Sequence, residues 1–151
     1  MSENPRILVI DDDENVRKIL SAVLVREGYS VDTAKNGEEA IEKSKRNFYN
    51  MALIDIRLPD MEGTKLLTTL KETVPKMVKL IMTGYPTLDN AVESVNRSAD
   101  GYLIKPINID RLLETIKAHL RKQQETMKYT QERVAEFIET RTKELRRLSE
   151  F

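Results

Sequence analysis

The sequence predicts an α/β protein built on a parallel sheet, and three observations support this prediction. Short apolar runs, which suit buried strands, alternate five times with segments whose apolar residues recur at helical spacing. Parallel neighbours need crossover connections, and an alternating order of strands and helices supplies them. Polar residues also gather directly after several of the expected strands, where open α/β sheets keep their binding crevices.

The expected strands and helices follow from these patterns. The five strands are expected at residues 6–10, 29–34, 51–55, 78–82 and 102–104. Residues 51–54, which precede Asp55, are all apolar, and this is typical of a central strand buried on both faces. Residues 29–34 alternate more between polar and apolar side chains and fit a strand nearer the edge of the sheet. The residues at helical spacing in the first four helices are Val16, Leu20, Val23 and Leu24 before Gly28; Ala40, Ile41 and Ser44, on one face, after Asn36-Gly37; Leu66, Leu67 and Leu70 after Gly63; and Leu88, Ala91, Val92 and Val95.

Composition narrows the classes of protein that the chain can belong to. With 25 basic and 25 acidic residues, nothing global indicates a nucleic-acid or anionic-membrane partner. The absence of cysteine excludes disulfides and thiolate metal sites. The segment before the first strand is too short for a signal sequence, and no segment approaches the roughly 20 apolar residues of a membrane span. We therefore expect a cytoplasmic protein with one domain and an appendage.

The appendage is a long helix that begins at Ile109 and runs to about Ser149 without Gly or Pro. Its start would cover the sheet through Leu113, Ile116 and Leu120. An apolar seam then continues through Met127, Thr130, Val134, Ile138, Leu145 and Leu148, with two successive steps of four that resemble a stutter in a heptad pattern. A rod of roughly 60 Å cannot fold back onto one small domain. We expect a second helix to bury the seam; the alternative is a solvated, charged helix.

Polar side chains follow four of the five strands. Asp11 and Asp12 come after the first strand, Asp55 ends the third, Thr83 follows the fourth, and Lys105 follows the fifth. Crowded carboxylates share protons or hold a cation, and oxygen ligands without His or Cys favour Mg²⁺. A carboxylate nucleophile beside Mg²⁺ and a lysine is equipped for phosphoryl transfer.

Two other polar residues have plainer interpretations. Asp13 directly precedes the first helix, so we interpret it as that helix's N-cap rather than as part of the acidic set. His119 is the only histidine, and it lies among Lys and Arg on the last helix, where we expect it to be solvated.

Over about residues 5–122 the chain resembles the response-regulator receiver domains of two-component signalling, which are called CheY-like. The resemblance rests on motifs that occur in order: Val9-Ile10-Asp11-Asp12-Asp13, Leu53-Ile54-Asp55, Leu58-Pro59-Asp60-Met61-Glu62-Gly63, Met82-Thr83-Gly84 and Tyr102-Leu103-Ile104-Lys105-Pro106. It implies a doubly wound, flavodoxin-like sheet of order 2-1-3-4-5. Residues 123–151 would then form a helical extension, a coiled coil or linker, continuous with the fifth helix.

The resemblance also implies a chemical role for the acidic residues. Asp55 would accept a phosphoryl group from the phosphohistidine of a sensor histidine kinase, so the protein would be a switch rather than a turnover enzyme. Asp12 and Asp55 would bind Mg²⁺ directly, together with the backbone carbonyl of Arg57. Asp11 would act on the cation largely through water.

The remaining implied roles concern the response to phosphorylation. Lys105 would pair with Asp55 or with the phosphoryl oxygen, and Thr83 would bond that oxygen. Tyr102 would turn inward as Thr83 moves, so that a local change of charge is converted into a change of surface around the fourth helix, the fifth strand and the fifth helix. The resemblance further implies a cis peptide bond between Lys105 and Pro106.

The chain departs from the family pattern at two points. Ser98 stands where the family usually has a glycine, which predicts a strained or altered end of the fourth helix. The family usually ends near residue 122 or carries an output domain, whereas here the run 139–145 is similar to signalling helices that connect sensor and output modules. We expect a homodimer through this helix, or a fragment that stops partway along a linker to a missing output domain.

Two alternative functions differ in class from the switch. A scaffold that acts without phosphorylation would not need the complete set of acids, threonine and lysine. A Mg²⁺-dependent aspartyl phosphohydrolase of the haloacid-dehalogenase-like kind would need a second acid two residues after Asp55, where this chain has Arg57.

Overall fold

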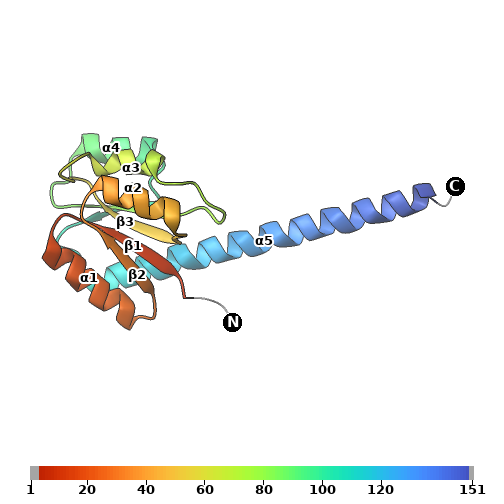
Figure 1. Ribbon diagram of the computed structural model, residues 1–151, viewed down its shortest axis with the longest axis horizontal. Coiled ribbons are helices and arrows are strands. Elements are labelled where there is room, and N and C mark those ends of the chain that lie inside the picture. The colour runs from red at the N-terminus through yellow and green to blue at the C-terminus, as the bar shows by residue number, and fades with distance from the viewer. Residues whose placement is uncertain (1–3, 150–151) are drawn as a thin grey trace.

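The computed structural model describes residues 4–149. Five parallel strands form a sheet of order β2-β1-β3-β4-β5, as expected (Figure 1). The elements are β1 (Arg6–Ile10), α1 (Glu14–Arg26), β2 (Ser30–Ala34), α2 (Gly37–Arg46), β3 (Met51–Asp55), α3 (Gly63–Thr69), β4 (Val78–Thr83), α4 (Leu88–Asn96), β5 (Gly101–Ile104) and α5 (Ile109–Ser149). The predicted α/β, doubly wound class is therefore confirmed.

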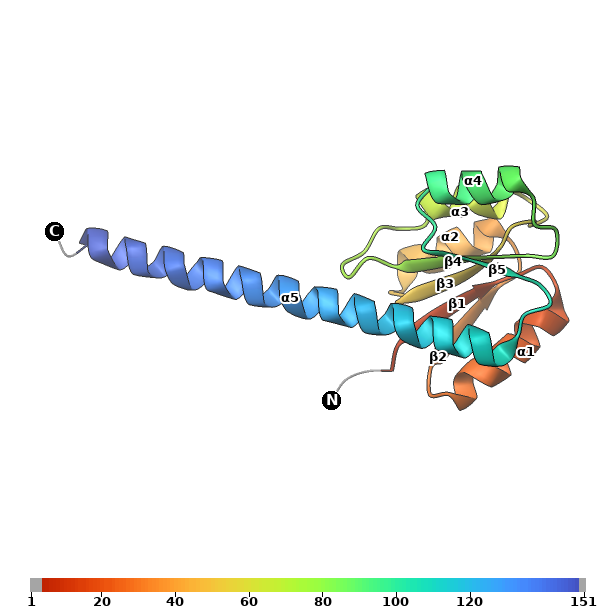
Figure 2. The same cartoon turned by 180° about the vertical axis from the view of Figure 1, so that it is seen from behind.

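Helices cover the sheet on both faces, and alternate residues of each inner strand point into two separate cores. In β1, Leu8 and Ile10 pack with α2 and α3, whereas Ile7 and Val9 pack against α1 and α5. Figures 1 and 2 show the two layers, with α2, α3 and α4 on one side of the sheet and α1 and α5 on the other. Every residue of β3 is buried, as its apolar run predicts, and β2 forms one edge.

Local capping follows the sequence closely. Asp13 accepts hydrogen bonds from the N–H groups of Asn15 and Val16, which confirms it as the N-cap of α1. Gly28 follows α1 in the left-handed region with φ +95°. Ser98 follows α4 with φ +68°, a conformation that a side chain opposes, so the strain expected from the missing glycine is present. The peptide bonds Lys105–Pro106 and Val74–Pro75 are cis, and only the first was expected.

Two helices depart from their apolar patterns: α4 buries a residue outside its pattern, and α5 buries one residue more than expected. In α4 the buried residue is Ser94, while Leu88 and Val95 are more than 70% exposed. In α5 the expected Ile116 is fully buried and the expected Leu113 and Leu120 pack partly against the core; Leu112, which was not expected, is fully buried as well. Leu112 lies four residues before Ile116, so the two share a face of the helix more closely than Leu113 does.

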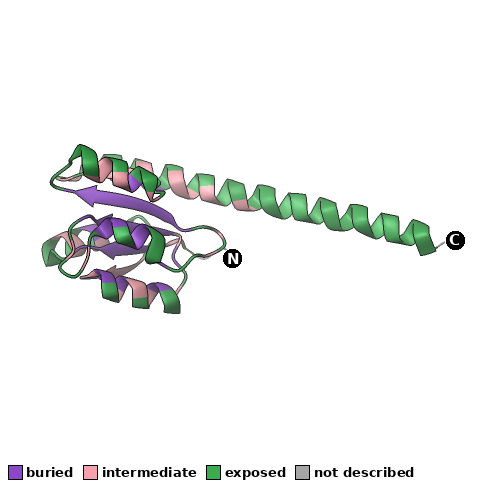
Figure 3. Ribbon diagram, turned by 90° about the horizontal axis from the view of Figure 1, so that it is seen from above, coloured by how far each residue is buried: buried purple, intermediate pink, exposed green. Residues whose placement is uncertain are grey.

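α5 leaves the domain as a rod, and Gln123 fastens it at the point of departure. The Gln123 side-chain amide donates to the carbonyl oxygens of Asn50 (2.9 Å) and Lys76 (2.8 Å), and it accepts from Asn50 Nδ2 (3.2 Å). Met127 is half-buried, whereas residues 128–149 are all exposed, as the green rod of Figure 3 shows. The last two residues of the expected extension, Glu150 and Phe151, lie outside the described residues.

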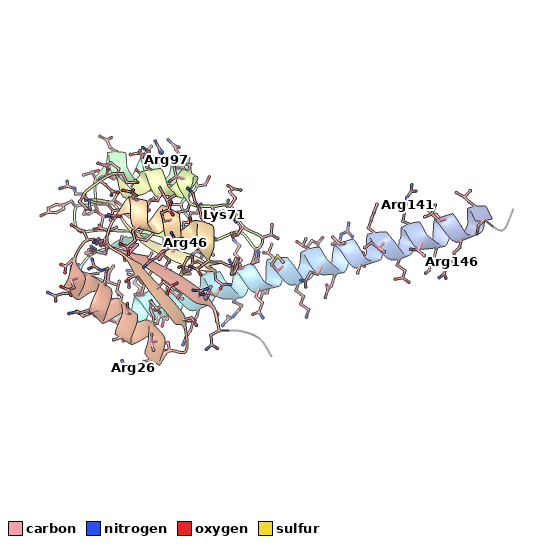
Figure 4. The ribbon with its side chains drawn as sticks, viewed as in Figure 1. Arg26, Arg46, Lys71, Arg97, Arg141 and Arg146 are labelled. Atoms are coloured by element: carbon pink, nitrogen blue, oxygen red, sulfur yellow. The ribbon has the colours of Figure 1, made fainter. Side chains whose placement is uncertain are left out.

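The surface agrees with a neutral composition. Of the six basic side chains labelled in Figure 4, Arg26 and Arg46 end α1 and α2, Lys71 and Arg97 lie just after α3 and α4, and Arg141 and Arg146 lie on the rod. Across residues 4–149, none of the helices combines the length and the apolar character needed to cross a bilayer. His119 is half-buried rather than fully solvated, since its Nε2 atom lies beside Gly101 at the start of β5.

Candidate functional site

Four strands deliver the predicted site residues to one edge of the sheet. Asp11 directly follows β1, Asp55 is the last residue of β3, Thr83 is the last of β4, and Lys105 directly follows β5. Because these strands are parallel neighbours, their carboxyl ends lie side by side. The edge therefore combines carboxylates, a hydroxyl and an amine that are far apart in the sequence.

The three acids form a compact cluster. Carboxylate oxygens of Asp11, Asp12 and Asp55 all lie within 4.8 Å of one another. Asp11 is fully buried and Asp55 is 6% exposed, whereas Asp12 faces solvent. Three hard oxygen donors at this spacing, open to water on the Asp12 side, fit a divalent cation such as Mg²⁺, which keeps several waters and uses few carboxylates.

Lys105 neutralises part of this charge. Its Nζ atom lies 2.7 Å from Asp11 Oδ2 and 3.6 Å from Asp55 Oδ1. Burial opposes the charge on this amine, but the hydrogen bond and the charge of Asp11, together with Asp55, outweigh burial and raise the pKa of Lys105 above its ordinary value. The lysine is thus held as a cation between the two buried acids.

Asp55 differs from an ordinary carboxylate. Burial, and then the negative charge of Asp11, raise the pKa of Asp55 to about 6, against the opposing effects of Lys105 and of the Arg57 N–H group. The positive charge of Lys105 therefore does not offset the combined effect of burial and of the neighbouring acid on Asp55. A positive charge added at this edge would stabilise the ionised form of Asp55, which is the form that can act as a nucleophile.

Thr83 is fully buried and is joined to the neighbouring loops. Its Oγ1 atom accepts a hydrogen bond from Tyr85 N–H (3.1 Å), and its carbonyl oxygen accepts from Lys105 N–H (2.7 Å). The Tyr85 ring in turn lies under the Arg57 guanidinium, 4.6 Å from the ring centroid. Thr83, Lys105 and the loop after β3 thus form one connected rim around Asp55.

Tyr102 lies on β5, where it was expected, and its ring is partly buried. It packs against the core that contains α2 and α3, and its hydroxyl group is buried with no hydrogen-bond partner among the described residues. A buried hydroxyl without a partner is unfavourable by about 1–3 kcal/mol. The side chain therefore occupies an inward position that its own polar group does not favour.

The loop between β3 and α3 fits closely against the strand that carries Asp55. Gly63 N–H donates to the carbonyl oxygen of Ile56 (2.7 Å). A Cβ atom at Gly63 would lie only 2.0 Å from the backbone oxygen of Asp55, so a side chain cannot be accommodated there. The glycine of this motif is thus required by the close approach of two backbone segments.

The sequence interpretation missed one residue of this loop. Both carboxylate oxygens of Asp60 bind backbone N–H groups at the start of α2. The pairing could have been suspected from Asn36-Gly37, which marks a helix start whose first N–H groups need acceptors. Nothing in the sequence shows that the acceptor lies more than 20 residues away.

Comparison with known proteins agrees with this geometry. The family model described as the response regulator receiver domain matches residues 7–117. The transcriptional regulatory protein ZraR of Klebsiella oxytoca is 41% identical over 114 residues, which are 76% of this chain and 26% of ZraR. The chain thus spans about a quarter of the length of the ZraR regulators that it matches.

Two solved structures show the same architecture. The CheY-like receiver domain protein of Methanospirillum hungatei is 43% identical with a TM-score of 0.78, and the match covers 82% of this chain and 98% of that one. TrrA of Thermotoga maritima, solved in complex with Mg²⁺ and BeF, is 34% identical with a TM-score of 0.68, and the match covers 76% and 98% of the two chains.

Proposed function

Because the chain belongs to the response regulator receiver family, we propose that it is a phosphorylation-controlled switch in which Asp55 accepts a phosphoryl group from a sensor histidine kinase. The observation that carries the proposal is the convergence of Asp11, Asp12 and Asp55 within 4.8 Å, with the amine of Lys105 beside them. The family match alone does not require this complete set of side chains.

The proposed reaction is a transfer between two side chains. An oxygen of ionised Asp55 forms a bond to phosphorus as the bond from phosphorus to the kinase's histidine nitrogen breaks, and the electron pair of that bond stays on the imidazole. Mg²⁺, when bound, neutralises charge on the transferred oxygens. Asp12, Asp55 and the Arg57 carbonyl would hold the cation, and Asp11 would act on it through water and orient Lys105.

Lys105 and Thr83 are proposed to sense the product. The Lys105 amine, 3.6 Å from Asp55 Oδ1, is close enough to pair with a phosphoryl oxygen after a small movement. The Thr83 hydroxyl can donate a hydrogen bond to that oxygen while it still accepts from Tyr85 N–H. A shift of Thr83 and β5 would then change the environment of Tyr102 and the exposed face of α4.

We propose residues 5–122 as the receiver unit and residues 123–151 as the helical extension through which it signals. The extension is proposed to pair with a second copy of the chain. The support is that Val134, Ile138, Leu145 and Leu148 are each more than half exposed along one side of the rod. An isolated helix of this kind is marginal in water without packing, so a partner helix would stabilise it.

Labelling with a small phosphodonor tests the switch. In the presence of Mg²⁺ the wild-type chain should take up one phosphoryl group that hydroxylamine removes, and Asp55→Asn should take up none. Asp12→Asn should retain the acceptor but need more Mg²⁺. A scaffold would take up no label, and a phosphohydrolase would release many equivalents of phosphate. Stoichiometric labelling of the Asp55→Asn variant would refute the site assignment.

Solution mass tests the proposed pairing of the rod. Ile138→Asp places a charge in the seam and should convert a dimer into a monomer at micromolar concentration. Thr140→Asp adds the same charge two residues away, on a different side of the helix, and should leave the mass unchanged. Equal masses for wild type and Ile138→Asp would count against pairing through this seam.

A further inference from the structure

The tip of the loop after β3 is tied to a helix that comes earlier in the sequence. Asp60 Oδ1 accepts a hydrogen bond from Gly37 N–H at 2.9 Å, and Asp60 Oδ2 accepts one from Glu38 N–H at 2.9 Å. Gly37 and Glu38 are the first two residues of α2. One exposed side chain thus supplies acceptors to two N–H groups that the helix itself leaves without partners.

An apolar contact accompanies these two hydrogen bonds. Met61 lies against the backbone of Gly37, where a Cβ atom would come within 2.3 Å of the Met61 sulfur. Met61 also packs against the core that contains α2 and α3. The loop tip is therefore fixed to the first turn of α2 by the charge-assisted hydrogen bonds of Asp60 and by the packing of Met61.

The same loop carries a group that the proposed metal site needs. Leu58 N–H donates to the Met61 carbonyl (3.2 Å), and Arg57 pairs with Glu62 in an antiparallel bridge. Arg57 therefore lies in one arm of a small hairpin whose tip is Asp60. Asp55 is held by the sheet, whereas the Arg57 backbone is held by this hairpin and by one long N–H bond to Asp55 Oδ1 (3.5 Å).

We infer that Asp60 is a positioning residue for the acceptor site: through α2 it holds the 56–63 loop, and with it the Arg57 carbonyl, where a cation can use it. This inference rests on the proposed function, because it assigns the carbonyl to a Mg²⁺ ion. Asp60 touches neither the cation nor the phosphoryl group. It acts on the site through the backbone, as outer partners of metal ligands commonly do.

The competing explanation is that Asp60 only caps α2. The chain offers a matched control for this, since Asn36 Oδ1 also caps α2 by accepting from Glu39 N–H (2.8 Å), and its side chain forms no hydrogen bond with the loop among the described residues. A second control addresses charge. Glu62 lies in the same loop, and its side chain is exposed and makes no capping hydrogen bond to α3. Glu62→Ala therefore removes an equal charge but keeps the hydrogen bonds between Asp60 and α2.

The experiment compares wild type with Asp60→Ala, Asp60→Asn, Asn36→Ala and Glu62→Ala. One readout is Mg²⁺ affinity, from amide chemical shifts of ¹⁵N-labelled protein titrated with MgCl₂. The other is hydrogen exchange of the Leu58 and Gly63 amides without Mg²⁺, which reports on the hairpin directly. The second readout remains available even if the metal does not bind.

Asp60→Ala should weaken Mg²⁺ binding about tenfold and speed exchange of both amides by a similar factor, whereas Asp60→Asn, which keeps one acceptor oxygen, should recover part of each. Asn36→Ala and Glu62→Ala should stay close to wild type in both readouts. Wild-type exchange in Asp60→Ala, or equal changes in Asn36→Ala, would overturn the inference. If wild type binds no Mg²⁺ while loop exchange still rises only in the Asp60 variants, the positioning role stands and the proposed metal chemistry fails.

Discussion

The acceptor edge of the sheet and the rod of α5 are opposite kinds of structure within one chain. At the edge, Asp11 and Asp55 are almost completely buried, and each is in contact with the amine of Lys105. Along the rod, every residue from 128 to 149 is exposed, and the ion pairs are between neighbours on the same helix. The first region is determined by tertiary contacts, the second by local helix formation.

This difference indicates where a substitution will be felt. Contacts at the edge join residues that are far apart in the sequence, so one change there alters several elements. Contacts within the rod are local, so a change there should leave the domain intact and act only on whatever the rod binds. Four predictions test this contrast, from the largest expected effect to the smallest.

The largest effect is expected at Gly63. Gly63→Ala would place a methyl group 2.0 Å from the Asp55 backbone oxygen, and backbone cannot move aside as a side chain can. We expect a loss of about 3 kcal/mol or more in the free energy of unfolding, measured with urea. Gly84→Ala is the matched control, because the nearest atom to its Cβ would be 4.0 Å away. Similar stability of the two variants would contradict the close approach.

A pH dependence follows from the acid cluster. The pKa of Asp55 is raised to about 6 in the folded chain, so between pH of about 4 and 6 the folded state binds a proton that the unfolded state has lost. Stability from this group is therefore present at low pH and falls as pH rises through 6. In Mg²⁺-free buffer, Asp55→Asn should exceed wild type by about 2 kcal/mol at pH 8, with the difference vanishing near pH 4.

Urea unfolding of both proteins across this pH range measures the difference. Mg²⁺ should reduce it at pH 8, because a cation stabilises the ionised wild-type acid and the amide variant does not benefit equally. A difference that is constant with pH would mean that Asp55 titrates normally.

The joint between the two regions should show an intermediate effect. Gln123→Ala removes the three hydrogen bonds to Asn50 and Lys76, and we expect a loss of about 1–2 kcal/mol in unfolding free energy. Gln124→Ala changes an exposed neighbour of the same type and should cost less than about 0.5 kcal/mol. Spin labels on the domain and on the rod should report a broader distance distribution only for Gln123→Ala.

The smallest effect is expected on the rod itself. Lys143→Ala removes an ion pair with Glu139 across one helical turn, in which the charged atoms lie 3.3 Å apart and both side chains are exposed. A change of about 0.3 kcal/mol in local helix stability is expected, and it should fade as salt is added. Circular dichroism at 222 nm measures it. A loss of domain stability would contradict the separation of the two regions.

The fold and the site were predictable from the sequence to the extent that local pattern and topology determine them. Asp55 ends a wholly apolar run, Thr83 ends a later strand and Lys105 directly follows the last one, so a parallel sheet must bring them to one edge. The polar tie of Asp60 to α2 and the Gln123 contacts were missed, because any acceptor could serve those N–H groups and the partners are set by loop geometry.

Periodicity was less reliable for α4 and for the start of α5. Leu88 and Val95 occur at helical spacing, yet their side chains face solvent. Ser94 is buried instead, and its hydroxyl group donates a hydrogen bond to the carbonyl oxygen of Asn90. Leu112 was missed beside Leu113, because adjacent leucines fit a helical pattern almost equally well. Neither periodicity nor sheet topology identifies the partner of the rod, because an exposed apolar stripe does not specify which molecule covers it.

Because α5 is one continuous helix, its angle at the Gln123 contact determines where its far end lies. About 22 residues extend past Met127, which at about 1.5 Å per residue makes a stiff arm of roughly 33 Å. A tilt of about 10° where the arm is fastened would swing its far end by about 6 Å, more than the rise of one helical turn. A small change of angle at the Gln123 contact would thus become a sideways displacement of several ångströms at the far end of α5.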